Sequence, residues 1–410
     1  METMSESGVE YDLLSPGFYA DPHPTLHRMR AADPVYWHPA LEAWIVTRYR
    51  DIDALLRDAR ASSARVEQLG KGAPPHTRAK MDEYVRFLSA WPLFRDRPGH
   101  PPLRAALARA FAPVGIEDGL EELLDCLVEE TLAQARGLGE VDFVSHFAYP
   151  IPARIIAEVL GIPPEDIPQF KQWTTDIFSL IGAGLANEAS VEAGYRGVVA
   201  LQQYTRDLIA RRRSQRKNDL ISRLLADASG GALIDDDIVA SCALMVVAGH
   251  ETTTSLLATA LFALLRHPDQ LDQVRDDPLL IDAVFDESLR HEGPVFSLIR
   301  RAAEDLCVGD RTVRRGQYMF SMLCAGNRDP ARFCEPDRFD IRRREQGHLA
   351  FGLGPHFCIG VRLARVVTRG VLRRILQEPG LKLVSTDAAW EPNISFRALS
   401  RLQIALSGGR

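Results

Sequence analysis

The sequence of 410 residues contains no run of about 20 uninterrupted apolar residues, so no segment is predicted to span a membrane. Its first residues, METMSESGVEYDLLSPGF, lack the basic start and the apolar core of a signal peptide. The six cysteines are widely scattered, without a CxxC pair or a zinc-finger spacing, which favours reduced thiols over a disulfide framework. These absences predict a soluble protein of the cytoplasm.

A strong excess of charge and an obvious linker are also absent. The 49 Lys and Arg residues against 55 Asp and Glu give a net charge of −6, which argues against nucleic-acid binding. No Pro/Gly/Ser-rich linker, low-complexity run or internal repeat divides the chain, and 46% hydrophobic residues are ample for a large core. We therefore expect residues 1–410 to form one large domain, with residues 1–18 as a flexible N-terminus.

Helical patterns dominate the sequence. The longest predicted helix, residues 235–266, is apolar on every face near its centre, so we expect it to run through the core. Further helices are predicted at residues 24–32, 51–58, 103–111, 116–136, 151–160, 169–181 and 192–213. Strand patterns occur at residues 35–38 and 43–47 (a predicted hairpin), 305–313, 318–323 and 401–406, the last alternating as an edge strand would. Residues 61–97 look irregular. The fold class predicted is mostly α, a single large helical domain with small peripheral β-sheets.

Residues 351–360, FGLGPHFCIG, surround one cysteine with glycines. These glycines allow backbone angles that a side chain would disfavour, so the loop can close tightly around Cys358. Residues 361–376 form a predicted helix, and the N–H groups at a helix N-terminus favour a thiolate over a thiol. A thiolate is one of the known axial ligands of haem iron. The alternative is a buried structural cysteine in a glycine-rich turn.

This loop resembles the haem-binding signature of the cytochrome P-450 family, F-G-x-G-x-[HR]-x-C-x-G, and every specified position is filled. The resemblance extends along nearly the whole chain. It implies the family's mostly helical fold, haem b with the Cys358 thiolate as the iron ligand, and dioxygen as a cosubstrate. It also implies electrons from NAD(P)H through ferredoxin reductase and ferredoxin, since no such module is fused to the chain. A monomer is expected.

Residues 248–253, AGHETT, place an acid and two hydroxyl groups inside the apolar helix, where burial without partners costs roughly 2–7 kcal/mol. They fill the family pattern A-G-x-[DE]-T-[TS]. By that resemblance Ala248 contacts the haem, Thr252 hydrogen-bonds the oxygen under activation, and Glu251 relays protons to it. The glycine is expected to loosen the helix, and the histidine at the variable position receives no role. The alternative is a threonine bonded to the preceding turn, with Glu251 in an ion pair.

The haem propionates require cations, and the resemblance supplies four. His100 and Arg104 match the family's H-x-x-x-R, Arg300 opens R-x-A-x-E-D, and His356 lies in the cysteine loop. The planar fork of arginine suits a carboxylate. Two prolines directly follow His100, although proline is tolerated in the first turn of a helix. Each cation could instead be an ordinary surface charge. The other implied cofactor contacts are Phe351, Gly352 and Gly360.

Glu287 and Arg290 form an E-x-x-R pair on one predicted helix face. Pairs with this spacing are usually exposed and weak. In the family, however, this pair packs with a downstream arginine behind the cysteine loop. Arg338, in the string PDRF, occupies that third position, so a structural role is predicted for all three.

The substrate pocket implied by the resemblance is apolar and selects by shape. Its walls are expected from the loop before the H-x-x-x-R motif, the central helix, the segment after E-x-x-R and a late turn. The candidates are Phe87, Leu88, Trp91, Phe94, Leu244, Met245, Val295, Phe296, Leu298, Ile394 and Phe396. Each could instead be an ordinary core residue. A mobile lid is expected at residues 170–191, where small residues weaken the helical pattern.

Two classes of function are compatible with these motifs. The first is a haem-thiolate monooxygenase that hydroxylates or epoxidises an apolar small organic molecule in specialised metabolism, with phenol coupling and nitration as other outcomes. The second is a haem-thiolate sensor or carrier. The acid–alcohol pair favours the enzyme, because a sensor needs no proton delivery. Arg362, Arg365 and Arg369 follow the loop and are either a docking surface for an acidic ferredoxin or a solvated helix face.

Overall fold

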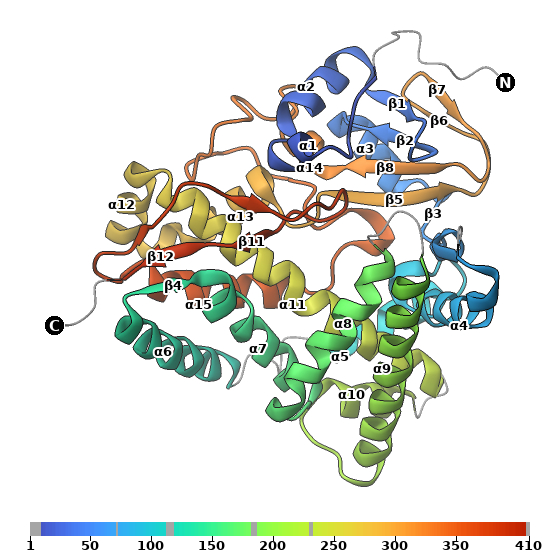
Figure 1. Ribbon diagram of the computed structural model, residues 1–410, viewed down its shortest axis with the longest axis horizontal. Coiled ribbons are helices and arrows are strands. Elements are labelled where there is room, and N and C mark those ends of the chain that lie inside the picture. Colours follow the sequence, from blue (N-terminus) through green and yellow to red (C-terminus); the bar gives the residue numbers. More distant parts are fainter. Residues whose placement is uncertain (1–9, 71–72, 112–118, 182–186, 229–232, 407–410) are drawn as a thin grey trace. The chain divides into compact units, whose positions relative to one another are not determined.

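The computed structural model describes residues 10–70, 73–111, 119–181, 187–228 and 233–406. The chain forms two compact units, each built from segments that are far apart in the sequence (Figure 1). The first unit comprises Met1–Ser62, Leu124–Ile151 and Thr252–Arg410, and the second comprises Ser63–Leu123 and Pro152–Glu251. The long helix α11, Asp235–Leu265, runs without interruption from the second unit into the first.

The first unit contains a five-stranded sheet in the order β1-β2-β8-β5-β3. Its strands are β1 (Val35–His38), β2 (Ala43–Val46), β8 (Tyr318–Met322), β5 (Ser297–Ala302) and β3 (Ala61–Ser62). β1 and β2 form the predicted hairpin, and β2 pairs in parallel with β8. Alternate residues enter different core clusters: Ile45 joins one cluster, while Trp44 and Val46 join another. This is the period of two that a strand imposes on its side chains.

Smaller sheets complete the first unit. β6 (Leu306–Val308) pairs with β7 (Arg311–Val313), and β10 (Ala389–Trp390) pairs with β11 (Leu399–Arg401). A third sheet has the order β4-β12-β9, from Glu140–Asp142, Gln403–Ala405 and Lys382–Leu383. The prediction of residues 401–406 as an edge strand was therefore wrong, because β12 is central. Alternation reports which faces a strand exposes but not whether both edges are paired.

The helices of the first unit include the predicted one at the start of the chain, α2. They are α1 (Pro16–Ala20), α2 (His23–Ala32), α3 (Tyr49–Arg57), α12 (Pro268–Asp276), α13 (Ile281–Glu292), α14 (Leu323–Asn327) and α15 (Val361–Ile375). Residues 10–18 are not the flexible segment that we expected. Tyr11, Leu13 and Phe18 are buried in a core cluster, so apolar packing anchors this part of the chain. Residues 1–9 lie outside the described residues.

The second unit is helical. Its helices are α4 (Arg78–Ser89), α5 (His100–Ala110), α8 (Ile167–Ile181), α9 (Glu188–Ser214) and α10 (Leu220–Ala228), together with most of α7 (Pro150–Leu160) and the start of α6 (Leu120–Leu138). α8 and α9 pack side by side (Figure 1). The prediction that residues 61–97 are irregular was wrong at α4. Tertiary packing stabilises this helix despite its weak helical sequence pattern, since Tyr84 is buried and its hydroxyl donates to the carbonyl of Ile177 at 2.7 Å. Of the expected lid, residues 182–186 lie outside the described residues.

Among the residues described, no helix combines the length and the apolar character needed to cross a bilayer.

Candidate active site

The cysteine loop is held closed by its own backbone. The N–H of Cys358 donates to the carbonyl of Phe351 at 3.0 Å. Gly352 and Gly354 have φ of 66° and 69°, the left-handed region that favours glycine. A Cβ at Gly354 would lie only 2.8 Å from the carbonyl oxygen of Leu56, so a side chain there would also clash. Both glycines therefore have the role that the sequence predicted.

Gly360 differs from these two glycines. Its φ is −84°, which any residue adopts, so the prediction of a special backbone angle at this position was wrong. Gly360 is the residue before the first turn of α15, and a Cβ built on it would lie 3.8 Å from the sulfur of Cys358, an ordinary van der Waals distance. Neither the backbone angle nor the space around Gly360 explains why this residue is a glycine.

The cysteine loop packs against the second half of α11. Phe351 contacts a buried cluster formed by Leu256, Phe285, Leu289 and Ala350. Leu256 lies one turn after Thr252 in α11, and residues four apart share a helix face. The face of α11 that carries Thr252 is therefore the face that approaches the cysteine loop.

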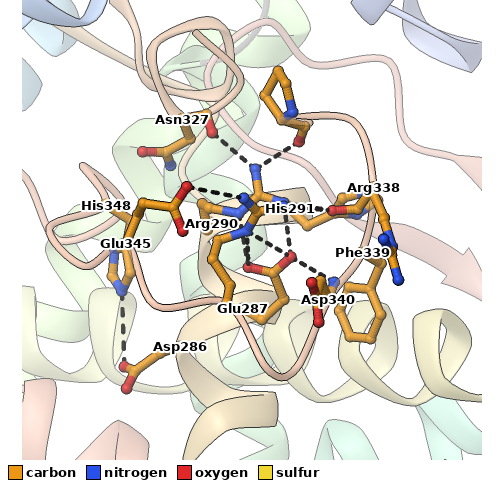
Figure 2. A network of polar contacts seen from close by, with 12 residues as sticks. Asp286, Glu287, Arg290, His291, Asn327, Arg338, Phe339, Asp340, Glu345 and His348 are labelled. Carbon is orange, nitrogen blue, oxygen red and sulfur yellow. Dashed lines mark hydrogen bonds and ion pairs between the residues drawn. The ribbon is translucent and has the colours of Figure 1, made fainter. Parts of the chain in front are cut away.

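The E-x-x-R pair is the centre of a buried polar network behind this loop. Both Nε and Nη2 of Arg290 donate to the Glu287 carboxylate at 2.7 Å. The other donors of Arg290 reach the backbone carbonyls of Asn327 (3.0 Å), Pro336 (2.7 Å) and Arg338 (3.0 Å), as Figure 2 shows. All five N–H groups of a guanidinium are thus used. The predicted structural role of this pair is supported by complete satisfaction of its donors.

The third arginine of the network is Arg343, not Arg338. The guanidinium of Arg343 lies 3.3 Å from the Glu287 carboxylate and is 7% exposed. The side chain of Arg338 is 62% exposed and pairs only at the surface, with Glu335 at 3.5 Å. Arg338 contributes its backbone carbonyl instead. Residues 342–344 are all arginine, and the sequence contains no signal that singles out the middle one.

The network also fixes the residues that lead into the cysteine loop. The side-chain carbonyl of Asn327 accepts from the N–H of Leu349 at 2.6 Å, and Glu287 accepts from the N–H of Asp340 at 2.8 Å. His348 lies 3.8 Å from Asp286 in α13 (Figure 2). Burial raises the pKa of Asp286, but the hydrogen bonds and charges of His348 and Arg365 lower it by more. The net effect is a lowered pKa. The sequence reasoning missed Asn327 and His348.

The predicted propionate partners divide between the two units. In the first unit, Arg300 lies in β5 and is 3% exposed, with one Nη1 bond to the carbonyl of Ile299 at 2.9 Å, and His356 lies in the cysteine loop. In the second unit, His100 is the first residue of α5, so the two prolines after it do not prevent the helix from starting. Burial, and then the charge of Arg104 one turn later, lower the pKa of His100.

The AGHETT segment lies inside α11 without breaking it. A Cβ at Gly249 would lie 2.8 Å from Ile156 in α7, so the glycine permits close helix packing. α11 continues through Gly249 as an α-helix. His250 is buried, and its Nε2 lies 3.2 Å from Oε1 of Glu251. Burial raises the pKa of Glu251, but the bond to His250 and the charges of His250 and Lys171 outweigh it, and the net pKa is lowered.

The candidate pocket residues of the first unit lie on two paired segments. Val295 and Phe396 face each other across a β-bridge, and Ser297 donates through its hydroxyl to the carbonyl of Ile394 at 3.0 Å. Leu298 approaches the cysteine loop, because a Cβ at Gly352 would lie 3.2 Å from it. These segments therefore border the loop.

Phe296 is better explained by packing than by a pocket. Its ring is 3% exposed and packs edge-to-face on Phe18, with centroids 6.3 Å apart. It belongs to the core cluster that also contains Tyr11 and Leu13, and Ile394 packs against the same cluster.

The candidate pocket residues of the second unit are all buried. Phe87, Leu88, Trp91 and Phe94 form one aromatic-rich group at the end of α4, in which Trp91 stacks on Phe94 at 6.2 Å and meets Phe87 edge-on at 5.8 Å. Leu244, Met245 and Ala248 lie in the first half of α11.

Comparison with known proteins identifies the family. The family model described as Cytochrome P-450 matches residues 195–402. The chain is 35% identical over 420 residues to the cytochrome P-450 monooxygenase PikC of Streptomyces venezuelae, covering 100% of this chain and 96% of that protein. The chain belongs to the cytochrome P-450 family. It is also 32% identical over 390 residues to the biotin biosynthesis cytochrome P-450 of Bacillus subtilis, covering 94% and 96% of the two chains.

The solved structures agree with this cytochrome P-450 assignment. The crystal structure of CalO2 superposes with a TM-score of 0.89 at 30% identity, covering 98% of this chain and 100% of that one. The fold is thus the mostly helical cytochrome P-450 fold that the sequence predicted, and the protein is a cytochrome P-450 monooxygenase.

The chemistry of the described cysteines fits the haem-thiolate group of this cytochrome P-450 family. Cys242 and Cys324 are buried, and burial raises the pKa of each thiol, to about 12 for Cys242, so neither readily forms a thiolate. Cys358 is exposed, sits in the only part of the sequence that matches F-G-x-G-x-[HR]-x-C-x-G, and precedes the N-terminus of α15. A thiol in this position can be deprotonated and reached by a metal.

Proposed function

We propose that this cytochrome P-450 holds haem b through the Cys358 thiolate and inserts one atom of dioxygen into an apolar small organic molecule of specialised metabolism, by hydroxylation or epoxidation. The observation that carries the proposal is the exposed Cys358 in a glycine-built loop that packs on α11 one turn from Thr252. Haem iron with an axial thiolate supplies the cleavage of the O–O bond and the transfer of oxygen.

The residues around the cysteine are proposed to bind and orient the cofactor. Arg300 and His356 would neutralise the propionates from the first unit, and His100 and Arg104 are the proposed contribution of the second. A buried guanidinium such as that of Arg300 suits a carboxylate, because charge-assisted bonds compensate for its desolvation. Backbone and apolar contacts with the ring are assigned to Ala248, Phe351, Gly352 and Gly360.

Proton delivery is assigned to Glu251 and Thr252. Splitting dioxygen heterolytically consumes two protons, which must reach a pocket from which bulk water is excluded. The pKa of Glu251 is lowered overall, so its side chain is a carboxylate at neutral pH, and both of its oxygens can accept hydrogen bonds. The hydroxyl of Thr252, the next residue of α11, can both accept and donate a hydrogen bond.

The substrate class follows from the residues proposed to touch it. Apart from the indole of Trp91 and the thioether of Met245, these side chains are aliphatic or phenyl groups, which select by shape and burial of apolar surface. Phenol coupling or nitration would use the same residues, and product analysis separates them from hydroxylation and epoxidation. A non-catalytic sensor is disfavoured by the acid–alcohol pair.

Electrons are proposed to come from NAD(P)H through ferredoxin reductase and ferredoxin. Arg365 and Arg369 were candidates for docking, but both pair with Asp282 in α13, and Arg365 also pairs with Asp286 at 2.8 Å. Arg362 is exposed and has no ion pair with another described residue, which leaves it as the better docking cation. The Arg362→Glu variant should reduce the rate of haem reduction by ferredoxin at low salt, whereas Arg344→Glu should not.

The function is tested with a compound library. Apolar ligands that shift the haem absorption are incubated with ferredoxin reductase, ferredoxin, NADPH and isotope-labelled dioxygen. The proposal expects a product that carries one labelled oxygen atom. Binding without NADPH consumption for every ligand would favour a sensor, and a coupled product without labelled oxygen would favour phenol coupling.

A further inference from the structure

His250 occupies the position of AGHETT to which sequence reasoning gave no role, yet it is 3% exposed. Its Nδ1 lies 2.7 Å from the backbone carbonyl oxygen of Val246, one turn earlier in α11. A carbonyl oxygen only accepts hydrogen bonds, so Nδ1 must carry a hydrogen. This contact fixes the tautomer of the imidazole: when the ring is neutral, its lone pair is on Nε2.

The other ring nitrogen faces an acid. Nε2 of His250 lies 3.2 Å from Oε1 of Glu251. If the ring were neutral and Glu251 ionised, the Nε2 lone pair would lie 3.2 Å from a carboxylate oxygen, and the two would repel. A single proton between them removes the repulsion, as either an imidazolium beside a carboxylate or an imidazole beside a carboxylic acid. The geometry therefore requires one proton between Nε2 of His250 and Oε1 of Glu251.

The charges nearby decide where that proton resides. Lys171 in α8 is the other cation that acts on Glu251, and it favours the carboxylate form. Burial favours the neutral acid, but the combined effect of His250 and Lys171 is larger, so the pKa of Glu251 is lowered. The carboxylate form of Glu251 leaves Nε2 of His250 as the place for the proton that their contact requires.

We propose that His250 is a positioning residue that orients the Glu251 carboxylate and stores the proton that Glu251 relays. In one cycle the Nε2–H bond breaks as an Oε1–H bond forms, Glu251 passes that proton toward Thr252, and a proton from water restores Nε2. No electrons move in this step. The inference rests on the proposed relay through Glu251 and extends it to a third member.

A purely structural histidine is the alternative, and the chain contains a matched example. His267 also directs Nδ1 at the carbonyl of the residue four positions earlier, Ala263, at 2.7 Å. In contrast to His250, it has no ion pair with a carboxylate among the described residues, and its ring packs on Phe339 at 5.2 Å. If bonding to the preceding turn were the whole role, the two rings would behave alike.

The test is the protonation state of each ring in protein labelled with ¹⁵N-histidine. The resonances of His250 and His267 are assigned by their loss in the His250→Gln and His267→Gln variants. At about pH 7.5 we expect both nitrogens of His250 to be protonated in the unmodified protein and only Nδ1 in Glu251→Gln, with the signals of His267 the same in both proteins. A neutral His250 in the unmodified protein, or one unchanged by Glu251→Gln, would overturn the inference.

A second readout separates storage of a proton from packing. His250→Gln should keep haem content and the thiolate-type carbonyl spectrum, but product formed per NADPH should fall several-fold, and its dependence on pH between about 6 and 8 should change. Unchanged coupling and pH profile would overturn the proposal. The ring measurement needs no substrate or turnover, so its failure is distinguishable from a failure of the proposed monooxygenase function, which the carbonyl spectrum and the labelled product report.

Discussion

At the scale of single residues, small and polar side chains acquire their meaning from what lies next to them. Gly249 and Gly354 are both glycines of family motifs, yet one makes room for Ile156 and the other for the carbonyl oxygen of Leu56. His250 occupies the variable position of the motif, but its two ring nitrogens contact Val246 and Glu251. Motif matching identifies such residues without giving their physical reason.

The first prediction concerns the hydroxyl of Thr252. Thr252→Ala removes the group proposed to receive the relayed proton, so oxygen should be reduced without reaching the substrate. Product per NADPH should fall by roughly one to two orders of magnitude, with hydrogen peroxide appearing in its place. NADPH, peroxide and product are measured in one assay.

The matched control for this prediction is Thr259→Ala. Thr259 lies in the same helix, is 1% exposed and bonds only the preceding turn, to the carbonyl of Leu256 at 3.3 Å. It should leave coupling unchanged. Full coupling in Thr252→Ala would contradict the relay.

At the scale of elements, the polar network of Glu287, Arg290 and Arg343 joins α13 to the residues that lead into the cysteine loop. The sequence predicted the pair correctly, because its spacing places both residues on one helix face. It gave the third position to Arg338, because the string PDRF matches the family. The guanidinium of Arg343 turns inward because it donates to three backbone carbonyls, those of Cys334, Glu335 and Arg338, and no local sequence pattern encodes this.

The second prediction tests that correction. Arg343→Ala leaves Glu287 paired with Arg290 but removes its second buried cation, and should lower the free energy of unfolding by about 1–3 kcal/mol. Arg338→Ala removes only a surface side chain and should cost less than about 1 kcal/mol, since its carbonyl remains. Urea unfolding followed by circular dichroism measures both. Equal losses, or a larger loss for Arg338→Ala, would restore the original assignment.

At the scale of the whole molecule, the longest helices, the hairpin of β1 and β2, and strand β8 were predictable, but β3, β5 and the packing at the ends of the chain were not. The pattern of α11 is long and apolar on all faces, so its existence and central course were clear. Residues 10–18 have no periodic pattern, and Tyr11, Leu13 and Phe18 hold them in place through contacts with residues far away in the sequence. Likewise, β12 became central through pairing with β4 and β9, which lie far away in the sequence.

The third prediction concerns acid. Burial lowers the pKa of His23, and the direction is the same for His27, His38, His100 and His291. The unfolded chain, with histidine pKa values of about 6.5, therefore binds more protons than the folded one below that pH. The contribution of these histidines to the free energy of unfolding should be fully present above about pH 6.5. It should decline as pH falls, by up to about 1.4 kcal/mol per pH unit for each histidine that stays neutral in the folded protein.

Glu292 should keep its contribution over this range. Its pKa is lowered well below the ordinary value, because burial is outweighed by His23, Arg397 and Arg328, so its stabilisation is lost only at lower pH. Urea unfolding between about pH 5 and 7 measures the slope, and His23→Gln should flatten it. A free energy of unfolding that rises toward pH 5 would contradict the assignment.

The account depends most on the bond between Cys358 and haem iron, and the carbonyl spectrum of the reduced protein measures it. After reconstitution with haemin, the unmodified protein and Cys307→Ser, which changes another exposed cysteine of the first unit, should both show the red-shifted band of thiolate ligation. Cys358→Ser should lose that band. An imidazole-type band in the unmodified protein, or a thiolate-type band that survives Cys358→Ser, would contradict the account.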